Sequence, residues 1–170
     1  MEATVLKAIE RQDASEMIWR ALAKASFAVL SHVTPAGEPR SSGVVFRVVD
    51  RRMYVAVAED SWKARHIAAN GRVAVTVPVR RGGIMSLLLP IPPATISFAG
   101  AAVVHPAGPL PAGPVADQLR PLLPPQRLAS CCLIEIVPRG DFVTYGVGLP
   151  LMQMRIPDLA RARVPVSGRE

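Results

Sequence analysis

The sequence is poor in aromatic residues, cysteine and long apolar runs. Only 5% of its 170 residues are aromatic, although half are hydrophobic. The core must therefore be built largely from valine, alanine and other aliphatic side chains, which favours strands with some helix. The longest apolar run, at 84–89, stops at Pro90 and is far shorter than the ~20 residues that span a bilayer. The chain begins with a mixed-charge segment and not a secretory signal, so we expect a cytoplasmic protein without a membrane span.

The two cysteines and three histidines have no spacing typical of a metal site. Cys131 and Cys132 are neighbours in a segment typical of a strand, so their side chains should point to opposite faces and form no disulfide. His32, His66 and His105 are scattered along the chain. The sequence therefore predicts no bound metal, and it predicts that both cysteines are small buried side chains.

Acidic residues are outnumbered by basic ones, 13 to 20, which gives a formal charge of +7. This charge is compatible with attraction to phosphate, to nucleic acid or to an acidic surface. The basic residues are dispersed as doublets, however, and no aromatic-interleaved RNA motif or helix-turn-helix pattern accompanies them. We therefore expect no nucleic-acid partner.

The order of predicted elements indicates a mainly β protein with flanking helices. A frayed N-terminal helix should precede a better one near Ser15–Ala25, which an Asp-x-x-Glu capping box opens. The pattern predicts strands at 27–31, 39–49, 53–58, 72–79, 94–105, 131–138 and 141–145, and further helices at 61–70 and 115–123. Together these predict a single-domain, small antiparallel barrel of six to seven strands over residues 1–146, followed by an irregular C-terminal docking tail at 147–170.

The segment from Gly82 to Pro93 breaks this pattern with an apolar run bounded by glycine and proline. Long apolar loops in compact domains are usually functional or interfacial, so a lid, a dimer contact and a misassigned strand all stay open. A further alternative is a protein-binding barrel that uses Ile84–Leu89 as an exposed patch.

The stretch Ser61-Trp62-Lys63-Ala64-Arg65-His66 is a candidate anion site. Ser61 is a good N-cap, the first turn of a helix offers unpaired N–H groups, and Lys63 and Arg65 add cationic donors beside them. The simpler interpretation is an ordinary N-cap followed by a solvated lysine. His66 is the one histidine near this turn, and it is either a proton donor or a surface residue of a short helix.

Three segments in order resemble the flavin-binding split-barrel family, the pyridoxamine 5'-phosphate oxidase-like proteins and their deazaflavin-dependent relatives. They are FAVLSHVTPAGEPRSSGVVFRV, MYVAVAEDSWKARHIAANGRVAVTV, and ATISFAGAAVV with the later CCLIEIVPRGDFVTYG. The resemblance implies an antiparallel split β-barrel and a homodimer with its cofactor at the interface. It also implies a cofactor that performs the redox chemistry itself, and no catalytic dyad is visible, so the catalytic residues stay unknown.

The same resemblance implies a set of cofactor-binding residues. Ser41 and Ser42 would lie near the phosphate or ribityl chain, and the backbone from Gly43 to Val45 near the ring. Ser61 and Lys63 match the phosphate contacts of the family. Trp62 stands where the oxidases usually have an arginine, so it either stacks on a ring or anchors packing, while Arg65 or Arg40 could substitute for the missing contact. The predicted set is Arg40, Ser41, Ser42, Gly43, Val44, Val45, Ser61, Trp62, Lys63 and Arg65.

The leading hypothesis is an oxidoreductase that binds FMN, or the deazaflavin coenzyme F-420, and transfers hydride or electrons to or from a small organic substrate. The alternative is a non-enzymatic flavin or haem binding protein of the same fold. Vitamin oxidase activity is not supported, because the arginine-rich C-terminal segment of true oxidases has no convincing counterpart here. The sequence does not choose between FMN, deazaflavin and haem.

Overall fold

The computed structural model describes residues 2–79, 93–149 and 160–167, and its helices and strands follow one another as predicted for a mainly β chain. The helices are α1 (Glu2–Lys24), α2 (Trp62–Asn70), α4 (Pro114–Leu119), η1 (Arg120–Leu122) and α5 (Pro125–Ala129). The strands are β1 (Phe27–Val33), β2 (Pro39–Val45), β3 (Arg47–Val49), β4 (Arg52–Val57), β5 (Arg72–Val79), β6 (Ala94–Val104), β7 (Cys132–Tyr145) and β8 (Arg161–Pro165).

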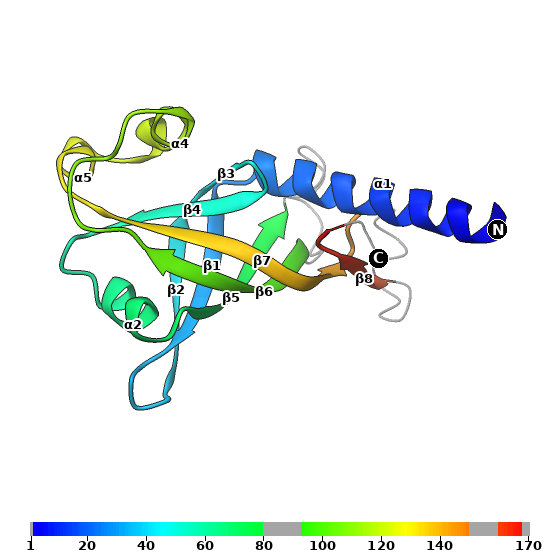
Figure 1. The fold of residues 1–170 in the computed structure, drawn as a ribbon, viewed down its shortest axis with the longest axis horizontal. Helices are drawn as coiled ribbons and strands as arrows, with labels where there is room; N and C mark the ends of the chain where they lie inside the picture. The colour runs from blue at the N-terminus through cyan, green and yellow to red at the C-terminus, as the bar shows by residue number, and fades with distance from the viewer. Residues whose placement is uncertain (1, 80–92, 150–159, 168–170) are drawn as a thin grey trace. The chain divides into compact units, whose positions relative to one another are not determined.

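These strands form one curled antiparallel sheet in the order β2-β1-β5-β6-β7-β4-β3, with β8 paired to β7 (Figure 1). The fold class predicted from the sequence, a mainly β antiparallel split barrel with flanking helices in a single domain, is confirmed by this half-barrel sheet. The chain contains two compact units, residues 26–75 with 99–139 and residues 1–25 with 76–98 and 140–170. Strands β5, β6 and β7 contribute residues to both.

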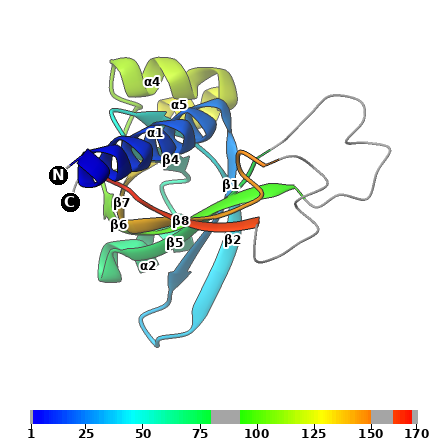
Figure 2. The same cartoon turned by 90° about the vertical axis from the view of Figure 1, so that its right-hand side faces the viewer.

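In the unit of residues 26–75 and 99–139, alternating strand side chains build the core. Ala28 and Leu30 of β1 and Val73 and Val75 of β5 are buried, as the alternation of these strands predicts. Figure 2 shows α2 beside the β1–β2 hairpin, whose tip extends past the helix. In both figures α4 and α5 lie together, near the end of β4.

Glu135 of β7 joins two basic side chains in this same unit. One carboxylate oxygen pairs with Arg52, and the other lies 3.0 Å from Nε2 of His105. Burial opposes the charged carboxylate, but hydrogen bonds from Arg52 and His105 outweigh it and lower the pKa of Glu135. This carboxylate is therefore held in its charged form by its neighbours.

In the unit of residues 1–25, 76–98 and 140–170, aromatic rings meet edge to face. Phe142 contacts Trp19 at 5.2 Å between ring centroids and Phe98 at 5.6 Å, both nearly perpendicular. The carbonyl of Val166 accepts hydrogen bonds from Ser15 Oγ at 3.2 Å and from Trp19 Nε1 at 3.3 Å. These contacts hold α1 against the chain next to β8.

Several predicted boundaries are wrong. The two N-terminal helices are one helix, because Ser15 faces inward and bonds Val166 instead of opening a second helix. The strand predicted at 39–49 is interrupted at Phe46, which is fully buried and whose N–H donates to the carbonyl of Ser26. The strands predicted at 131–138 and 141–145 are one strand, because Gly140 absorbs a φ of 68° without ending it.

The C-terminal half of the chain differs from the prediction at two more places. A helix, α5, follows the proline pair that was expected to end helical structure, and β8 forms where an irregular tail was expected. Pairing to β7 supplies the backbone hydrogen bonds that the short β8 segment lacks alone. Residues 82–92 of the predicted Gly82–Pro93 loop, which include the Ile84–Leu89 patch, lie outside the described residues. Cys131 and Cys132 are both free and buried, as predicted.

Candidate functional site

A cavity of about 720 Å³ opens in the unit of residues 26–75 and 99–139. Its volume lies within the range of about 300–1,000 Å³ that is typical of small-molecule sites. Its walls are His32, 40–45, 56–58, 60–63, His66, 122–124 and Arg127. The cavity therefore brings together the end of β4, the start of α2, the edge strand β2 and the η1–α5 connection.

Helix α2 begins at this cavity as the sequence predicts. Ser61 is its N-cap residue, and Gly71 ends the helix in the left-handed conformation, with its N–H donating to the carbonyl of Ile67. Ser61 Oγ makes no capping hydrogen bond, and no acidic residue stands in the first turn. The first turn itself thus contains no carboxylate that would offset the positive end of the helix dipole, which favours an anion beside it.

Lys63 contributes a further positive charge to this wall. The side chain lines the cavity, and no hydrogen bond or ion pair engages it within the part of the chain that the structure describes. Arg127 of α5 lines the cavity as a second cation, while Asp60 is the acidic residue in the wall. The wall therefore carries more positive than negative charge.

Strand β2 forms a second wall at the edge of the described sheet. Its register with β1 places His32 opposite Arg40, Ser31 opposite Ser41 and Leu30 opposite Ser42. Because β2 has a strand neighbour on one side only, half of its backbone N–H and C=O groups face away from the sheet. These groups are available to a flat polar ligand.

The two serines of β2 differ in their surroundings. Ser41 Oγ is exposed and lies 2.7 Å from Ser31 Oγ, so these hydroxyls already bond each other. Ser42 lies on the opposite face, and its Oγ is buried without a hydrogen-bond partner. Of the two serines, Ser42 is therefore the one whose hydroxyl lacks a hydrogen-bond partner.

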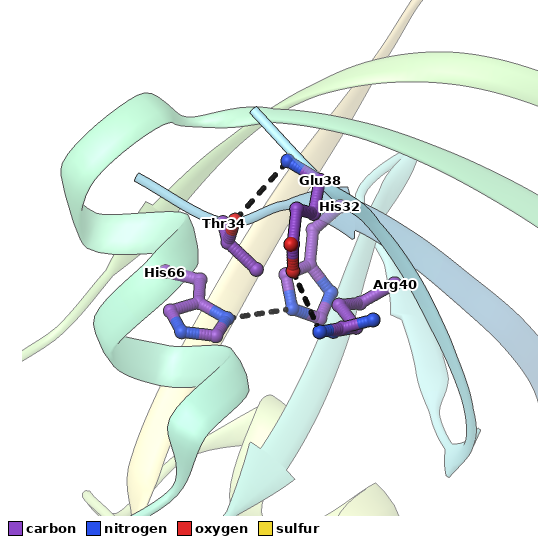
Figure 3. Close-up of polar contacts among 5 residues, drawn as sticks. All are labelled: His32, Thr34, Glu38, Arg40 and His66. Carbon is purple, nitrogen blue, oxygen red and sulfur yellow. Dashed lines mark hydrogen bonds and ion pairs between the residues drawn. The ribbon is translucent and has the colours of Figure 1, made fainter. Parts of the chain in front are cut away.

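Two histidines meet in the same wall, as Figure 3 shows. Nε2 of His32 on β1 lies 3.2 Å from Nδ1 of His66 on α2. His32 is 8% exposed, and its other nitrogen, Nδ1, is buried without a partner. Burial is the largest cause that lowers the pKa of His32, and nearby charges on His66, Lys63 and Arg40 act in the same direction.

Arg40 is already paired at the open end of the hairpin. Its Nη2 lies 2.7 Å from Oε2 of Glu38, and both side chains are more than half exposed (Figure 3). Exposed pairs of this kind contribute about 0–1 kcal/mol, so a bound anion could compete with Glu38 for the guanidinium. The Arg40 guanidinium could thus exchange its pairing with Glu38 for one with a bound anion.

Trp62 stands on the rim of the cavity and is 72% exposed. The Arg65 guanidinium lies 5.2 Å from its ring centroid, and the His66 ring meets it nearly edge-on at 6.0 Å. Arg65 does not line the cavity. The structure thus brings nine of the ten sequence-predicted site residues into one cavity wall and leaves Arg65 outside it.

Sequence reasoning missed part of the wall. Leu122–Pro124 and Arg127 enter it because α5 begins at the proline pair, and proline in a first helical turn was the signal that could have indicated this helix. Buried Leu119 and Cys131 hold the preceding segment in place by packing against Ala56. His32 was missed because its pairing with His66 depends on the fold.

Within the described ranges, no group of three or more histidine, cysteine, aspartate or glutamate side chains is arranged to hold a metal ion. None of the described helices is both long enough and apolar enough to cross a bilayer.

The chain has no matching family model and no matching curated protein. Solved structures do resemble it. A candidate pyridoxamine 5'-phosphate oxidase from Listeria innocua has a TM-score of 0.53 at 16% identity, over 74% of this chain and 93% of its own. An F-420 reductase has a TM-score of 0.51 at 21% identity, over 72% and 93%. The fold is the pyridoxamine 5'-phosphate oxidase-like split barrel.

The same split barrel also occurs in proteins named for haem. HutZ, the haem storage protein from Vibrio cholerae, has a TM-score of 0.57 at 15% identity, over 77% of this chain and 94% of its own. At these identities the likeness establishes the fold and leaves the ligand open. The residues of the cavity must therefore decide which ligand this split barrel takes.

Proposed function

We propose that this protein binds FMN, or the deazaflavin coenzyme F-420, and transfers hydride or electrons to or from a small organic substrate. The observation that carries the proposal is that one cavity contains nine residues predicted from the sequence. Those residues come from β2 and from the start of α2, two segments that are separate in the sequence. A chance resemblance would not be expected to place both segments on one cavity.

The chemistry of the wall fits a phosphorylated planar cofactor. Ser61, the first turn of α2 and Lys63 would hold the phosphate, because a doubly charged anion needs several charge-assisted donors. The free backbone edge from Gly43 to Val45 would contact polar atoms of the ring. Trp62 is placed on the rim, where an aromatic face could cover the ring.

When bound, such a cofactor supplies the redox chemistry, so the chain itself needs only to bind, orient and shield it. Leu122, Leu123 and Pro124 add apolar side chains to the same cavity wall. Arg127 beside them adds a positive charge. This wall would orient the substrate, and it favours an organic anion with an apolar body.

A homodimer with the cofactor at its interface is part of the proposal. Phe27 and Val45 are opposite each other in the β1–β2 register, and they are 49% and 36% exposed. A second copy that covers this apolar pair would also enclose a ligand along β2. Light scattering tests this directly, and a monomer with and without FMN would contradict it.

Haem is the second candidate ligand, because His32 and His66 line the cavity and haem-named proteins share the fold. Titration of the purified chain with FMN, coenzyme F-420 and haem, followed by absorption and fluorescence, separates the candidates. We expect micromolar or tighter binding of FMN or the deazaflavin. Failure of both to bind at micromolar concentration would refute the proposed function, and a haem Soret shift alone would favour the non-enzymatic alternative.

A further inference from the structure

Two buried polar atoms share one cavity wall. Among the described residues, the buried side-chain nitrogens and oxygens without a hydrogen-bond partner are His32 Nδ1 and Ser42 Oγ. His32 pairs with Arg40 in the hairpin register, and Ser42 stands two residues further along β2, so both occupy the same face. A buried polar group without a partner costs free energy, and both of these groups belong to residues that line the cavity.

The hydrogen bond between the two histidines fixes what His32 can offer to that cavity. His32 Nε2 lies 3.2 Å from His66 Nδ1, so one of these nitrogens carries the shared hydrogen. If His66 Nδ1 donates, neutral His32 carries its own hydrogen on Nδ1 and presents a donor. If His32 Nε2 donates, His32 Nδ1 presents a lone pair instead.

An anion bound beside these histidines would select between the two tautomers. Arg40 of β2 lies beside His32 in Figure 3, and both Arg40 and Lys63 of α2 are positive charges that help to lower the pKa of His32. A group drawn into this part of the cavity is therefore an anion, and an anionic oxygen can only accept hydrogen bonds. It is complementary to His32 only when Nδ1 carries the hydrogen, which requires His66 Nδ1 to donate.

We propose that His32 Nδ1–H and Ser42 Oγ–H are the inner donors to the anionic group of the bound ligand, and that His66 is a positioning residue that holds His32 in the Nδ1–H tautomer. The ligand class is a phosphate monoester. Its identity as a flavin phosphate rests on the proposed function, but the donor pair does not depend on the ring.

Histidine tautomers can be read directly from the intact chain labelled with ¹⁵N-histidine. The chain has only three histidines, so variants at His32, His66 and His105 assign every signal. In two-bond ¹H–¹⁵N spectra we expect His32 in the Nδ1–H form when FMN or inorganic phosphate is bound. Both FMN and inorganic phosphate should shift its Nδ1 resonance. An Nε2–H tautomer at His32, or a His32 signal that neither probe shifts, would overturn the inference.

Substitution of His66 tests the positioning role. The Asn amide nitrogen can stand near the position of His Nδ1 and donate, whereas leucine cannot. We expect His66→Leu to weaken FMN binding by about three- to tenfold, the effect of one neutral hydrogen bond. His66→Asn should restore most of the affinity and the His32 tautomer. His105→Leu is the matched control, because this histidine pairs with Glu135 outside the cavity.

The measurements separate this inference from the proposed function. If phosphate shifts the His32 Nδ1 resonance but FMN does not bind, the donor pair is supported and the flavin function is refuted. If FMN binds equally to the wild type, His66→Leu and His66→Asn, and His32 is not shifted, the flavin function stands and the donor pair falls. The wild-type spectra decide the tautomer even if a His66 variant does not fold.

Discussion

Replacing Lys63 by methionine should weaken the binding of FMN and leave the fold intact. The change removes the ammonium group but keeps an unbranched side chain, and Lys63 has no hydrogen-bond or ion-pair partner among the described residues whose loss would destabilise the protein. A hydrogen bond to a charged group contributes about 1.5–3 kcal/mol, which corresponds to a roughly ten- to hundredfold higher Kd. The loss should shrink at high salt, because exposed charges are screened.

Arg65→Met provides the matched control for this prediction. It removes one positive charge from the same helix two residues later, but Arg65 lies outside the cavity wall and over the Trp62 ring. Isothermal titration of FMN into both variants at two salt concentrations, with urea unfolding of each, gives the comparison. Equal losses in the two variants would mean that Lys63 acts only through long-range charge. Unchanged affinity in Lys63→Met would mean that the phosphate does not bind at the start of α2.

Three further predictions concern stability and the rim of the cavity. Gly100→Ala should lower the free energy of unfolding in urea by about 1–3 kcal/mol, because a Cβ at residue 100 would lie 2.7 Å from a β7 side-chain carbon. Gly108→Ala should be close to neutral, because a Cβ at residue 108 would meet open space. Equal losses in the two variants would contradict the packing argument. The lowered pKa of Glu135 means that its charged form stabilises the fold above the unfolded-state pKa. Glu135→Gln should therefore be less stable than the wild type at pH 7, and the difference should shrink as the pH falls through the folded pKa. A difference that stays constant as the pH falls would contradict this. In a Trp19→Phe variant Trp62 is the remaining tryptophan, and bound FMN should quench its fluorescence if the FMN ring lies at the rim of the cavity. Saturable FMN binding without quenching would place the FMN ring away from Trp62.

Local sequence patterns predicted those elements whose signals are contained within a few residues. Helix α2 was found because a serine N-cap precedes it and Gly71 follows it, and β5 because its valines alternate. The pattern failed at Ser15 and Gly140, where a residue that often ends an element lies inside one. Long-range contacts explain the first failure, since Ser15 bonds Val166, and backbone freedom of glycine explains the second.

The residues of the candidate site also divide into those with a local sequence signal and those that only the fold brings together. The cationic start of α2 and the serines of β2 were visible, because each has a local motif and a resemblance to known proteins. The partnership of His32 with His66 was not, because it spans 34 residues and exists only once β1 and α2 are packed together. Arg127 was missed because the proline pair before it was taken as the end of a helix and not as the start of one.

The bonds from Ser15 and Trp19 to Val166 bear on the order in which the protein folds. They join residues 151 and 147 positions apart, so α1 obtains these bonds only after the chain has been made as far as Val166. Contacts of such long range form late because the intervening loop must close first. During synthesis α1 would therefore expose the indole of Trp19 for much of the elongation time. In a chain that stops before residue 166, the Ser15 hydroxyl would either be buried without its acceptor or stay exposed on an undocked helix.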